Sequence, residues 1–306
     1  MSPALRLSGS ITALATPFSI DGTLDLRAWA QMLEKQVAAG TTAVVVAGST
    51  GEAAALTDEE YDTLLLEAVR VVAGRLGVIA GTGLSNTAKT IALTRRAAEL
   101  GAQAALVVTP PYVRPTQAGL VAHYRAVAAQ GGLPVVLYNV PGRTGVDMLP
   151  ETVAALAGVE GVVGLKEARG DAERWAALAP LAAGGFALLS GDDPTFVAAM
   201  RAGAAGVISV ASNVVPASLA AITAAARNGA FDAAERQDAA LQPLYDFLGC
   251  APNPIPLKAL LKAQGLGADL RLPLLPLEAP HTASLPAMLS LVDRAEADAL
   301  AACRAA

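Results

Sequence analysis

Lys166 is the residue of this chain best placed to do covalent chemistry. It lies near the end of an apolar run at residues 162–168 (VVGLKEA) that otherwise has the composition of a buried β-strand. Burial in apolar surroundings favours the neutral amine, which can attack a carbonyl carbon to form a Schiff base. A lysine there can also extend to solvent or pair with Glu167. The other four lysines lie in helix-patterned segments with routes to solvent: Lys35, Lys89, Lys258 and Lys262.

Two other segments place hydroxyl groups directly after apolar runs. The turn at residues 48–52 (GSTGE) carries Ser49 and Thr50 between glycines, and its exposed amides can hold a carboxylate or phosphate. The same turn also fits an ordinary strand-to-helix connection with Ser and Thr as caps. The segment 109–115 (TPPYVRP) holds Tyr112 on a loop that prolines stiffen, so we expect its side chain to project.

Tyr138 and Arg143 follow the fifth apolar run. A phenol beside an amine can relay the protons that Schiff-base formation requires, and an arginine can form a bidentate pair with a substrate carboxylate. Taken singly, Tyr138 also fits a core residue with a satisfied hydroxyl group, and Arg143 a surface charge. Their coincidence with Lys166 at the end of the next run indicates a shared site.

Eight apolar runs, alternating with helix-patterned segments, position these residues. Such runs are typical of parallel strands buried on both faces, and eight strand–helix units in about 225 residues predict a (β/α)8 TIM barrel. No glycine-rich dinucleotide fingerprint follows the first run, which disfavours an open doubly wound sheet. We expect a barrel domain at residues 1–227 and a C-terminal helical extension at 228–306. The runs lie at residues 11–15, 43–47, 77–81, 104–108, 134–138, 162–166, 187–190 and 206–210.

Composition excludes several classes of function. The chain has 306 residues, 4% aromatic content and a net charge of -5, so we expect neither a nucleic-acid nor a membrane partner. No apolar stretch reaches the roughly 18 residues that span a bilayer, and the N-terminus lacks the apolar core of a signal peptide. The two histidines and two cysteines show no ligand-like spacing, so we expect reduced thiols, no metal site and a cytoplasmic location.

Three motifs resemble those of a known family. They are GSTGE at residues 48–52, YNVP at 138–141 and GLKE at 164–167. With them, nearly the whole chain resembles the pyruvate-dependent class I aldolases of the dihydrodipicolinate synthase and N-acetylneuraminate lyase superfamily. The closer likeness is to the 4-hydroxy-tetrahydrodipicolinate synthase branch, because sugar-acid lyases of the superfamily usually lack the arginine found here as Arg143. The turn SGDD at residues 190–193 and the segment PNPIPLK at 252–258 also fit this branch.

The resemblance implies roles for the residues that would handle pyruvate. Lys166 would attack the ketone and become the enamine nucleophile. Tyr138 would relay protons with Thr50 and with Tyr112, which a neighbouring subunit would donate. Ser49 and Thr50 would hold the pyruvate carboxylate. Ser49 replaces a frequent threonine of the family but keeps the hydroxyl group.

The resemblance also implies how the second substrate is bound and used. Arg143 would bind the carboxylate of L-aspartate 4-semialdehyde, whose aldehyde the enamine attacks. Ile208 would line the pyruvate pocket, and Gly191 would contact substrate. Cyclisation by the substrate amine would give the heterocycle used in lysine and diaminopimelate synthesis. No metal or organic cofactor is implied.

Assembly and regulation follow from the same resemblance. The family implies a homo-oligomer, which we expect to be a tetramer built as a dimer of tight dimers. Lysine-sensitive members bind the inhibitor at the dimer interface. Lys89 stands there in place of a common glutamate and Pro111 in place of an aromatic residue, so we expect weak or no inhibition by lysine. The matching positions are Ala53, Asp58, Tyr61, Ser85, Lys89 and Pro111.

Two other functions remain compatible with the motifs. One is a pyruvate-dependent aldolase of the same fold that acts on a 2-keto-3-deoxy sugar acid and shares Lys166 and Tyr138. The other is a non-catalytic paralogue that binds a keto acid as a sensor or structural partner. The presence of Lys166, Tyr138 and Arg143 together argues against this second alternative.

Overall fold

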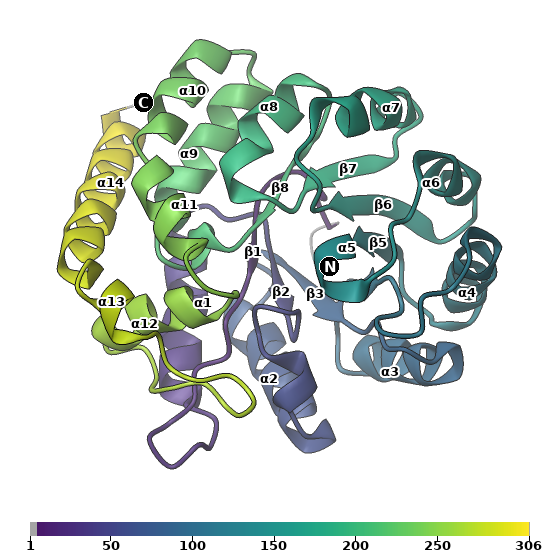
Figure 1. Ribbon diagram of the computed structural model, residues 1–306, viewed down its shortest axis with the longest axis horizontal. Coiled ribbons are helices and arrows are strands. Elements are labelled where there is room, and N and C mark those ends of the chain that lie inside the picture. The colour runs from purple at the N-terminus through teal and green to yellow at the C-terminus, as the bar shows by residue number, and fades with distance from the viewer. Residues whose placement is uncertain (1–4, 306) are drawn as a thin grey trace.

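Eight parallel strands close into a barrel in the order β1 to β8 (Figure 1). The computed structural model describes residues 5–305. Each strand pairs with its sequence neighbours, and β8 pairs with β1 to close the ring. The prediction of a (β/α)8 TIM barrel is therefore confirmed. The strands are β1 (Gly9–Ala13), β2 (Ala43–Val46), β3 (Gly77–Gly81), β4 (Ala104–Val108), β5 (Val135–Asn139), β6 (Val162–Glu167), β7 (Ala187–Ser190) and β8 (Gly206–Ser209).

Helices follow the strands and surround the barrel (Figure 1). Local capping signals set where several of them begin. Thr57 and Glu60 form a capping box at the start of α2, and Asn86 accepts a hydrogen bond from Lys89 N at the start of α3. These helices are α1 (Leu26–Ala38), α2 (Asp58–Val72), α3 (Thr87–Glu99), α4 (Gln117–Gln130), α5 (Pro141–Thr144), α6 (Pro150–Ala157), α7 (Ala172–Ala182), α8 (Phe196–Arg201) and α9 (Pro216–Arg227), with short 3-10 helices η1 (Ala53–Ala55), η2 (Asp193–Thr195) and η3 (Ala211–Asn213).

The first strand departs most from its expected range. It was expected at residues 11–15 and is observed two residues earlier, at Gly9–Ala13. The strand ends early because Ala15 N donates its hydrogen bond to the side chain of Asn213, at 3.0 Å from Oδ1, and leaves the strand ladder. Periodicity does not reveal this, because Ala15 is itself fully buried.

Two apolar layers meet at the barrel wall, which is why the strands are apolar on both faces. An inner cluster fills the barrel and includes Ile11, Val45, Ile79 and Ile208. A larger outer cluster packs the strands against the surrounding helices. Side chains alternate between these layers along each strand, so neighbouring residues serve different environments.

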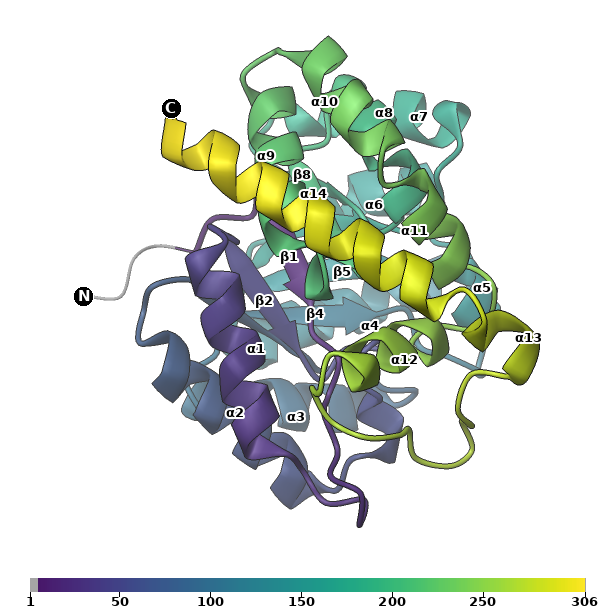
Figure 2. The same cartoon turned by 90° about the vertical axis from the view of Figure 1, so that its left-hand side faces the viewer.

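Further helices follow the last barrel helix, as expected from the sequence. In Figure 2, α14 lies across the outside of the molecule, and it contacts α9, α11 and α12. No helix in the part of the chain that the structure describes is long and apolar enough to cross a membrane. These C-terminal helices are α10 (Phe231–Ala239), α11 (Gln242–Leu248), α12 (Ile255–Ala263), α13 (Ala279–Thr282) and α14 (Leu285–Ala305).

The expectation that Lys258 reaches solvent is wrong. It lies on the buried face of α12 with only 2% of its surface exposed. Its Nζ lies 2.9 Å from Glu52 Oε1, and it also donates a hydrogen bond to Thr16 O. Helical patterning suggested an exposed position, but Glu52 comes from a distant loop and supplies a counter-charge inside the protein. Lys166 is therefore not the sole buried lysine.

Candidate active site

Lys166 and Tyr138 meet at the carboxyl end of the barrel strands. They are register partners on β6 and β5, and both are nearly buried, at 4% and 7% exposure. The ammonium nitrogen of Lys166 lies 4.5 Å from the centroid of the Tyr138 ring. Tyr138 belongs to the inner cluster, so this pair lies on the inner side of the barrel wall. An amine and a phenol are thus neighbours in largely apolar surroundings.

Gly191 leaves room for the Lys166 side chain. A Cβ atom at residue 191 would lie 2.8 Å from Lys166 Cε and 3.1 Å from Cγ. Gly191 N donates to Glu167 O at 2.7 Å, which fixes the loop after β7 against the end of β6. Ile208, expected in the pyruvate pocket, is fully buried and shares the inner cluster with Tyr138. Gly191 therefore adjoins Lys166, and Ile208 shares the barrel interior with Tyr138.

The turn after β2 places Thr50 close to the C-terminal part of the chain. Thr50 is 4% exposed, and Asn253 Nδ2 donates to its hydroxyl oxygen at 3.0 Å. Ser49 beside it is partly exposed. Gly51 is packed tightly, because a Cβ atom there would lie 3.0 Å from Leu14 O. The turn thus has a fixed backbone with one buried and one accessible hydroxyl group.

Arg143 lies on α5, just after β5. Its Nη2 donates to Asn253 O at 2.8 Å, and the side chain is otherwise exposed. Asn253 therefore links Thr50 to Arg143, although it was not among the expected site residues. Its Oδ1 is buried without a hydrogen-bond partner among the described residues. The segment 252–258 carried the sequence signal for Asn253, but nothing in that segment predicts its contacts with residues 110 and 203 positions away.

Comparison with known proteins identifies the family of this chain. The profile of the dihydrodipicolinate synthetase family matches residues 6–291. The chain belongs to this family. A 4-hydroxy-tetrahydrodipicolinate synthase from Xanthomonas axonopodis pv. citri is 62% identical over 97% of this chain and 96% of its own length. One from Stenotrophomonas maltophilia K279a is 62% identical over 92% of this chain and 94% of its own length.

Solved structures of the family have the same fold. The chloride-inhibited dihydrodipicolinate synthase of Acinetobacter baumannii, crystallised with pyruvate, matches with a TM-score of 0.92 and 40% identity. The match covers 94% of this chain and 99% of that one. The resemblance inferred from three motifs is thus confirmed, as is the interpretation of the chain as a synthase of this family. None of these relatives supports the sugar-acid alternative.

Tyr112, another of the expected catalytic residues, lies on the loop after β4. Its side chain is 93% exposed, so within this chain it does not join Lys166 and Tyr138. Its backbone has φ 70° and that of Arg114 has φ 46°, which is uncommon for residues other than glycine. Hydrogen bonds from Tyr112 N to Thr144 O and from Arg114 Nε to Gly145 O hold the loop in place. A costly backbone conformation thus presents an aromatic ring to the outside.

Proposed function

We propose that this chain condenses pyruvate with L-aspartate 4-semialdehyde to give 4-hydroxy-tetrahydrodipicolinate, with Lys166 as the Schiff-base residue. The observation that carries the proposal is the buried Lys166–Tyr138 pair at the carboxyl end of the barrel, 4.5 Å from nitrogen to ring centroid. Carboxyl strand ends are where TIM barrels place their chemistry. The names of the close relatives support the same reaction.

The first half of the reaction activates pyruvate. The Lys166 amine adds to the ketone carbon, and loss of water leaves an imine. Loss of a methyl proton then gives the enamine, with the imine nitrogen as the electron sink. Tyr138 is placed to carry protons in these steps, with Thr50 as its partner in the relay. Ser49 and Thr50 hold the pyruvate carboxylate through their hydroxyl and amide groups.

The second half joins the two substrates. The enamine carbon attacks the aldehyde carbon, and the aldehyde oxygen takes up a proton to become the hydroxyl group of the product. Arg143 binds the carboxylate of the semialdehyde, because a guanidinium matches that geometry in a bidentate pair. The substrate amine then attacks the imine carbon, which closes the ring and releases Lys166.

The proposal includes a homotetramer of tight dimers in the cytoplasm, with residues 228–306 as an extension of the catalytic barrel. The strained, exposed loop of Tyr112 supports an active site completed across a subunit interface. One of the matching solved structures is a monomeric variant of dihydrodipicolinate synthase, so the assembly of this chain needs its own measurement. Cys250 and Cys303 are unpaired, in keeping with a reducing compartment.

Borohydride trapping tests the Schiff base directly. Reduction in the presence of pyruvate should add one adduct per chain, and peptide mapping should locate it at Lys166. Lys166→Arg should abolish the adduct, because a guanidinium is not neutral enough to attack. An adduct at the buried Lys258, or none in the unmodified protein, would overturn the mechanism. Lys262→Met is a matched control, because it removes an exposed lysine of α12 and should leave the adduct in place.

The second substrate is tested by product formation. The enzyme should consume pyruvate with L-aspartate 4-semialdehyde and should turn over 2-keto-3-deoxy sugar acids much more slowly. A reversed preference would favour the sugar-acid lyase alternative, with Lys166 and Tyr138 in the same roles. Absence of trapping, with turnover of neither substrate class, would favour the keto-acid-binding paralogue, because a binding protein has no reason to form an imine.

A further inference from the structure

Asn139 and Glu167 form a second cross-strand pair directly beyond the first. They are register partners, one residue after Tyr138 and Lys166 respectively. Because side chains alternate along a strand, they point to the outer face of the barrel wall. Both are fully buried, and Asn139 Nδ2 lies 3.1 Å from each carboxylate oxygen of Glu167. Two strand ends that carry the reacting groups are therefore joined by side chains on their opposite face.

An arginine from α7 fixes the Glu167 carboxylate. Arg174 is almost fully buried, and its Nε and Nη2 each lie 2.7 Å from Glu167 Oε2. Arg169 N donates to the other oxygen, Oε1, at 2.9 Å. Burial raises the pKa of Glu167, and the charge of Arg174 opposes that rise. With these donors in place, the carboxylate has one orientation and cannot turn away from Asn139.

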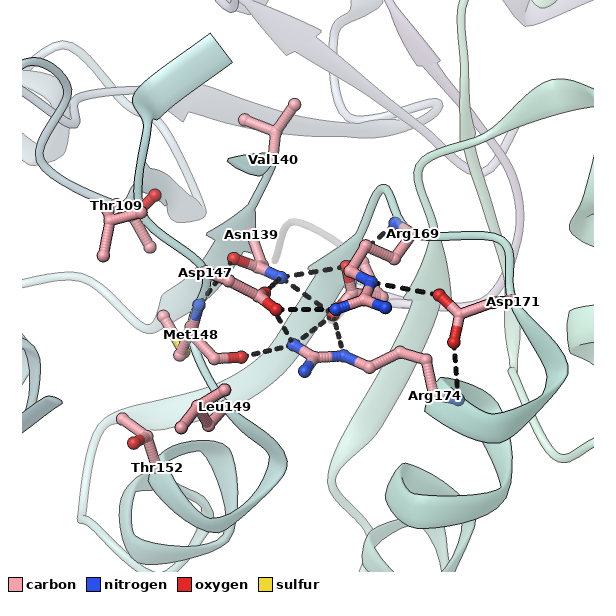
Figure 3. Close-up of polar contacts among 12 residues, drawn as sticks. Thr109, Asn139, Val140, Asp147, Met148, Leu149, Thr152, Arg169, Asp171 and Arg174 are labelled. Carbon is pink, nitrogen blue, oxygen red and sulfur yellow. Dashed lines mark hydrogen bonds and ion pairs between the residues drawn. The ribbon is translucent and has the colours of Figure 1, made fainter. Parts of the chain in front are cut away.

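Asn139 also holds the loop that follows the Arg143 helix. Figure 3 shows Asn139, Asp147 and Arg174 pointing toward one another between the strands and α7. Asn139 Nδ2 donates to Asp147 Oδ1 at 2.7 Å, and Asn139 Oδ1 accepts from Met148 N at 2.9 Å. Arg174 also donates to Met148 O. The ends of β5 and β6 and the loop after α5 are thus held by one hydrogen-bonded network.

We propose that Asn139 and Glu167, with Arg174, are positioning residues that fix the register and separation of Tyr138 and Lys166 during imine formation. This inference rests on the proposed function. Nothing in the network touches the reacting atoms, so its action is through the two strand ends. A buried ion pair adds little stability compared with apolar packing, and fixing a single arrangement is a recognised use of such pairs.

The size of the effect follows from geometry. Imine formation and proton relay require the amine, the phenol and the ketone to approach within about 3 to 3.5 Å. If Asn139 and Glu167 part, the strand ends can shift sideways while the apolar barrel stays folded. A misplacement of about 1 Å can cost roughly 100-fold in rate, so loss of the pair should slow imine formation about 10- to 100-fold.

Glu167→Gln tests the proposal in the full-length enzyme. It keeps the size of the side chain and removes the charge that Arg174 orients. At saturating pyruvate, and well below the melting temperature of the variant, kcat and the rate of borohydride trapping should fall about 10- to 100-fold while KM for pyruvate changes less than about threefold. Asn139→Ala is the second variant. It removes the cross-strand hydrogen bonds to Glu167 but leaves the Glu167–Arg174 ion pair intact, and it should show the same fall in kcat with little change in KM.

Asp171→Asn is the matched control. Asp171 accepts hydrogen bonds from Arg169 Nε and Arg174 N at the exposed edge of the network but contacts neither strand end. Asparagine caps a helix as well as aspartate does, so trapping and kcat should stay within about twofold of the parent. If Glu167→Gln or Asn139→Ala folds and traps pyruvate at the parent rate, the network serves packing alone and the proposal is overturned. Absence of trapping in the parent would instead overturn the proposed function.

Discussion

Lys166 passes so close to Gly191 that the site has no room for one added methyl group. The Cβ of an alanine at residue 191 would lie 2.8 Å from Lys166 Cε, closer than real Cβ contacts allow. The flexible lysine side chain can move aside, so the fold tolerates the methyl group. The amine of Lys166 is then displaced. At the scale of single residues, chemistry is therefore more sensitive than stability to such a change.

Gly191→Ala should slow borohydride trapping with pyruvate by about 10-fold or more, because displacement of the amine by a fraction of an ångström to ~1 Å disturbs the attack. The melting temperature should change little. Gly158→Ala is the matched control, since a Cβ at that residue meets nothing within 4 Å. Equal trapping rates for the two variants would show that Lys166 accommodates the methyl group at no cost to chemistry.

Arg143→Ala should damage use of the semialdehyde far more than use of pyruvate. A lost bidentate carboxylate contact should lower kcat/KM for the aldehyde by roughly 30- to 1000-fold, while the pyruvate imine still forms. Steady-state kinetics with each substrate varied in turn give the comparison. Little change for the aldehyde would mean that Arg143 serves only its hydrogen bond to Asn253 O.

At the scale of elements, the loop after β4 exposes an aromatic side chain in a strained backbone conformation. Its Tyr112 is almost fully exposed in a conformation that costs energy, and Val113 beside it is 53% exposed. An aromatic and an apolar side chain held outward on a stiff loop fit contact with a second copy of the chain. The loop therefore connects catalysis with assembly in the proposed function.

Mixing Tyr112→Phe subunits with Lys166→Ala subunits should restore activity that neither variant has alone. A shared site in the mixed oligomer would carry both native groups. The measurement is activity after subunit exchange, with mixed oligomers verified by mass. If mixed oligomers form and remain inactive, Tyr112 acts within its own chain or has no catalytic part.

Lysine should inhibit weakly or not at all. One structural relative, the enzyme of Cyanidioschyzon merolae, was solved with lysine bound. At the positions that the family resemblance assigns to the inhibitor, Lys89 is exposed and adds a positive charge, and Ser85 Oγ donates to Pro111 O at 3.0 Å. Exposed Asp58 leaves some attraction for an ammonium group. Titration of L-lysine in the coupled assay should give half-inhibition above about 1 mM. Inhibition well below that concentration would show that the inhibitor uses other residues.

At the scale of the whole molecule, a buried charge pair joins the C-terminal helices to the barrel. Lys258 on α12 pairs with Glu52, the last residue of the turn that carries Thr50, and Arg271 N donates to the other oxygen of Glu52 at 3.0 Å. Arg271 and Lys258 also lie over the ring of Phe18, at 4.1 Å and 4.3 Å from its centroid. The C-terminal segment is thus anchored directly to the turn at residues 48–52.

Glu52→Gln should lower the free energy of unfolding by about 3 to 5 kcal/mol at neutral pH, because it leaves the Lys258 ammonium buried without its partner. Burial already holds the pKa of Lys258 below its ordinary value, and Glu52 opposes that shift. Without Glu52 the pKa of Lys258 in the folded variant falls further. The unfolded variant then binds more protons than the folded variant at alkaline pH, so its deficit in the free energy of unfolding should shrink as pH rises from about 7 toward about 10. Denaturant unfolding across this range measures it.

Asp269→Asn is the control for this prediction, because it breaks the exposed Lys262–Asp269 pair instead. An exposed pair contributes about 0 to 1 kcal/mol, so its loss should be small at every pH. A deficit in Glu52→Gln that is equally small would mean that water reaches Lys258 and replaces the carboxylate.

The sequence by itself determined the barrel and the pairing of Tyr138 with Lys166. Apolar runs with short turns are local patterns, so they located eight strands, and adjacency of β5 and β6 in the fold placed Tyr138 beside Lys166. The strand ends also identified Ser49, Thr50 and Arg143 as candidates, because the carboxyl ends of a barrel share one rim.

Only the tertiary structure decided which distant side chains complete the surroundings of that pair. Lys258 was expected to reach solvent, because helical periodicity does not reveal a counter-charge that lies 206 positions away in the chain. Asn253 and Arg174 were missed for the same reason. Their hydrogen bonds join segments that are distant in the sequence, so local composition does not predict them. The burial of Asn139 and Glu167 behind Tyr138 and Lys166 likewise follows from packing against α7, which no single segment encodes.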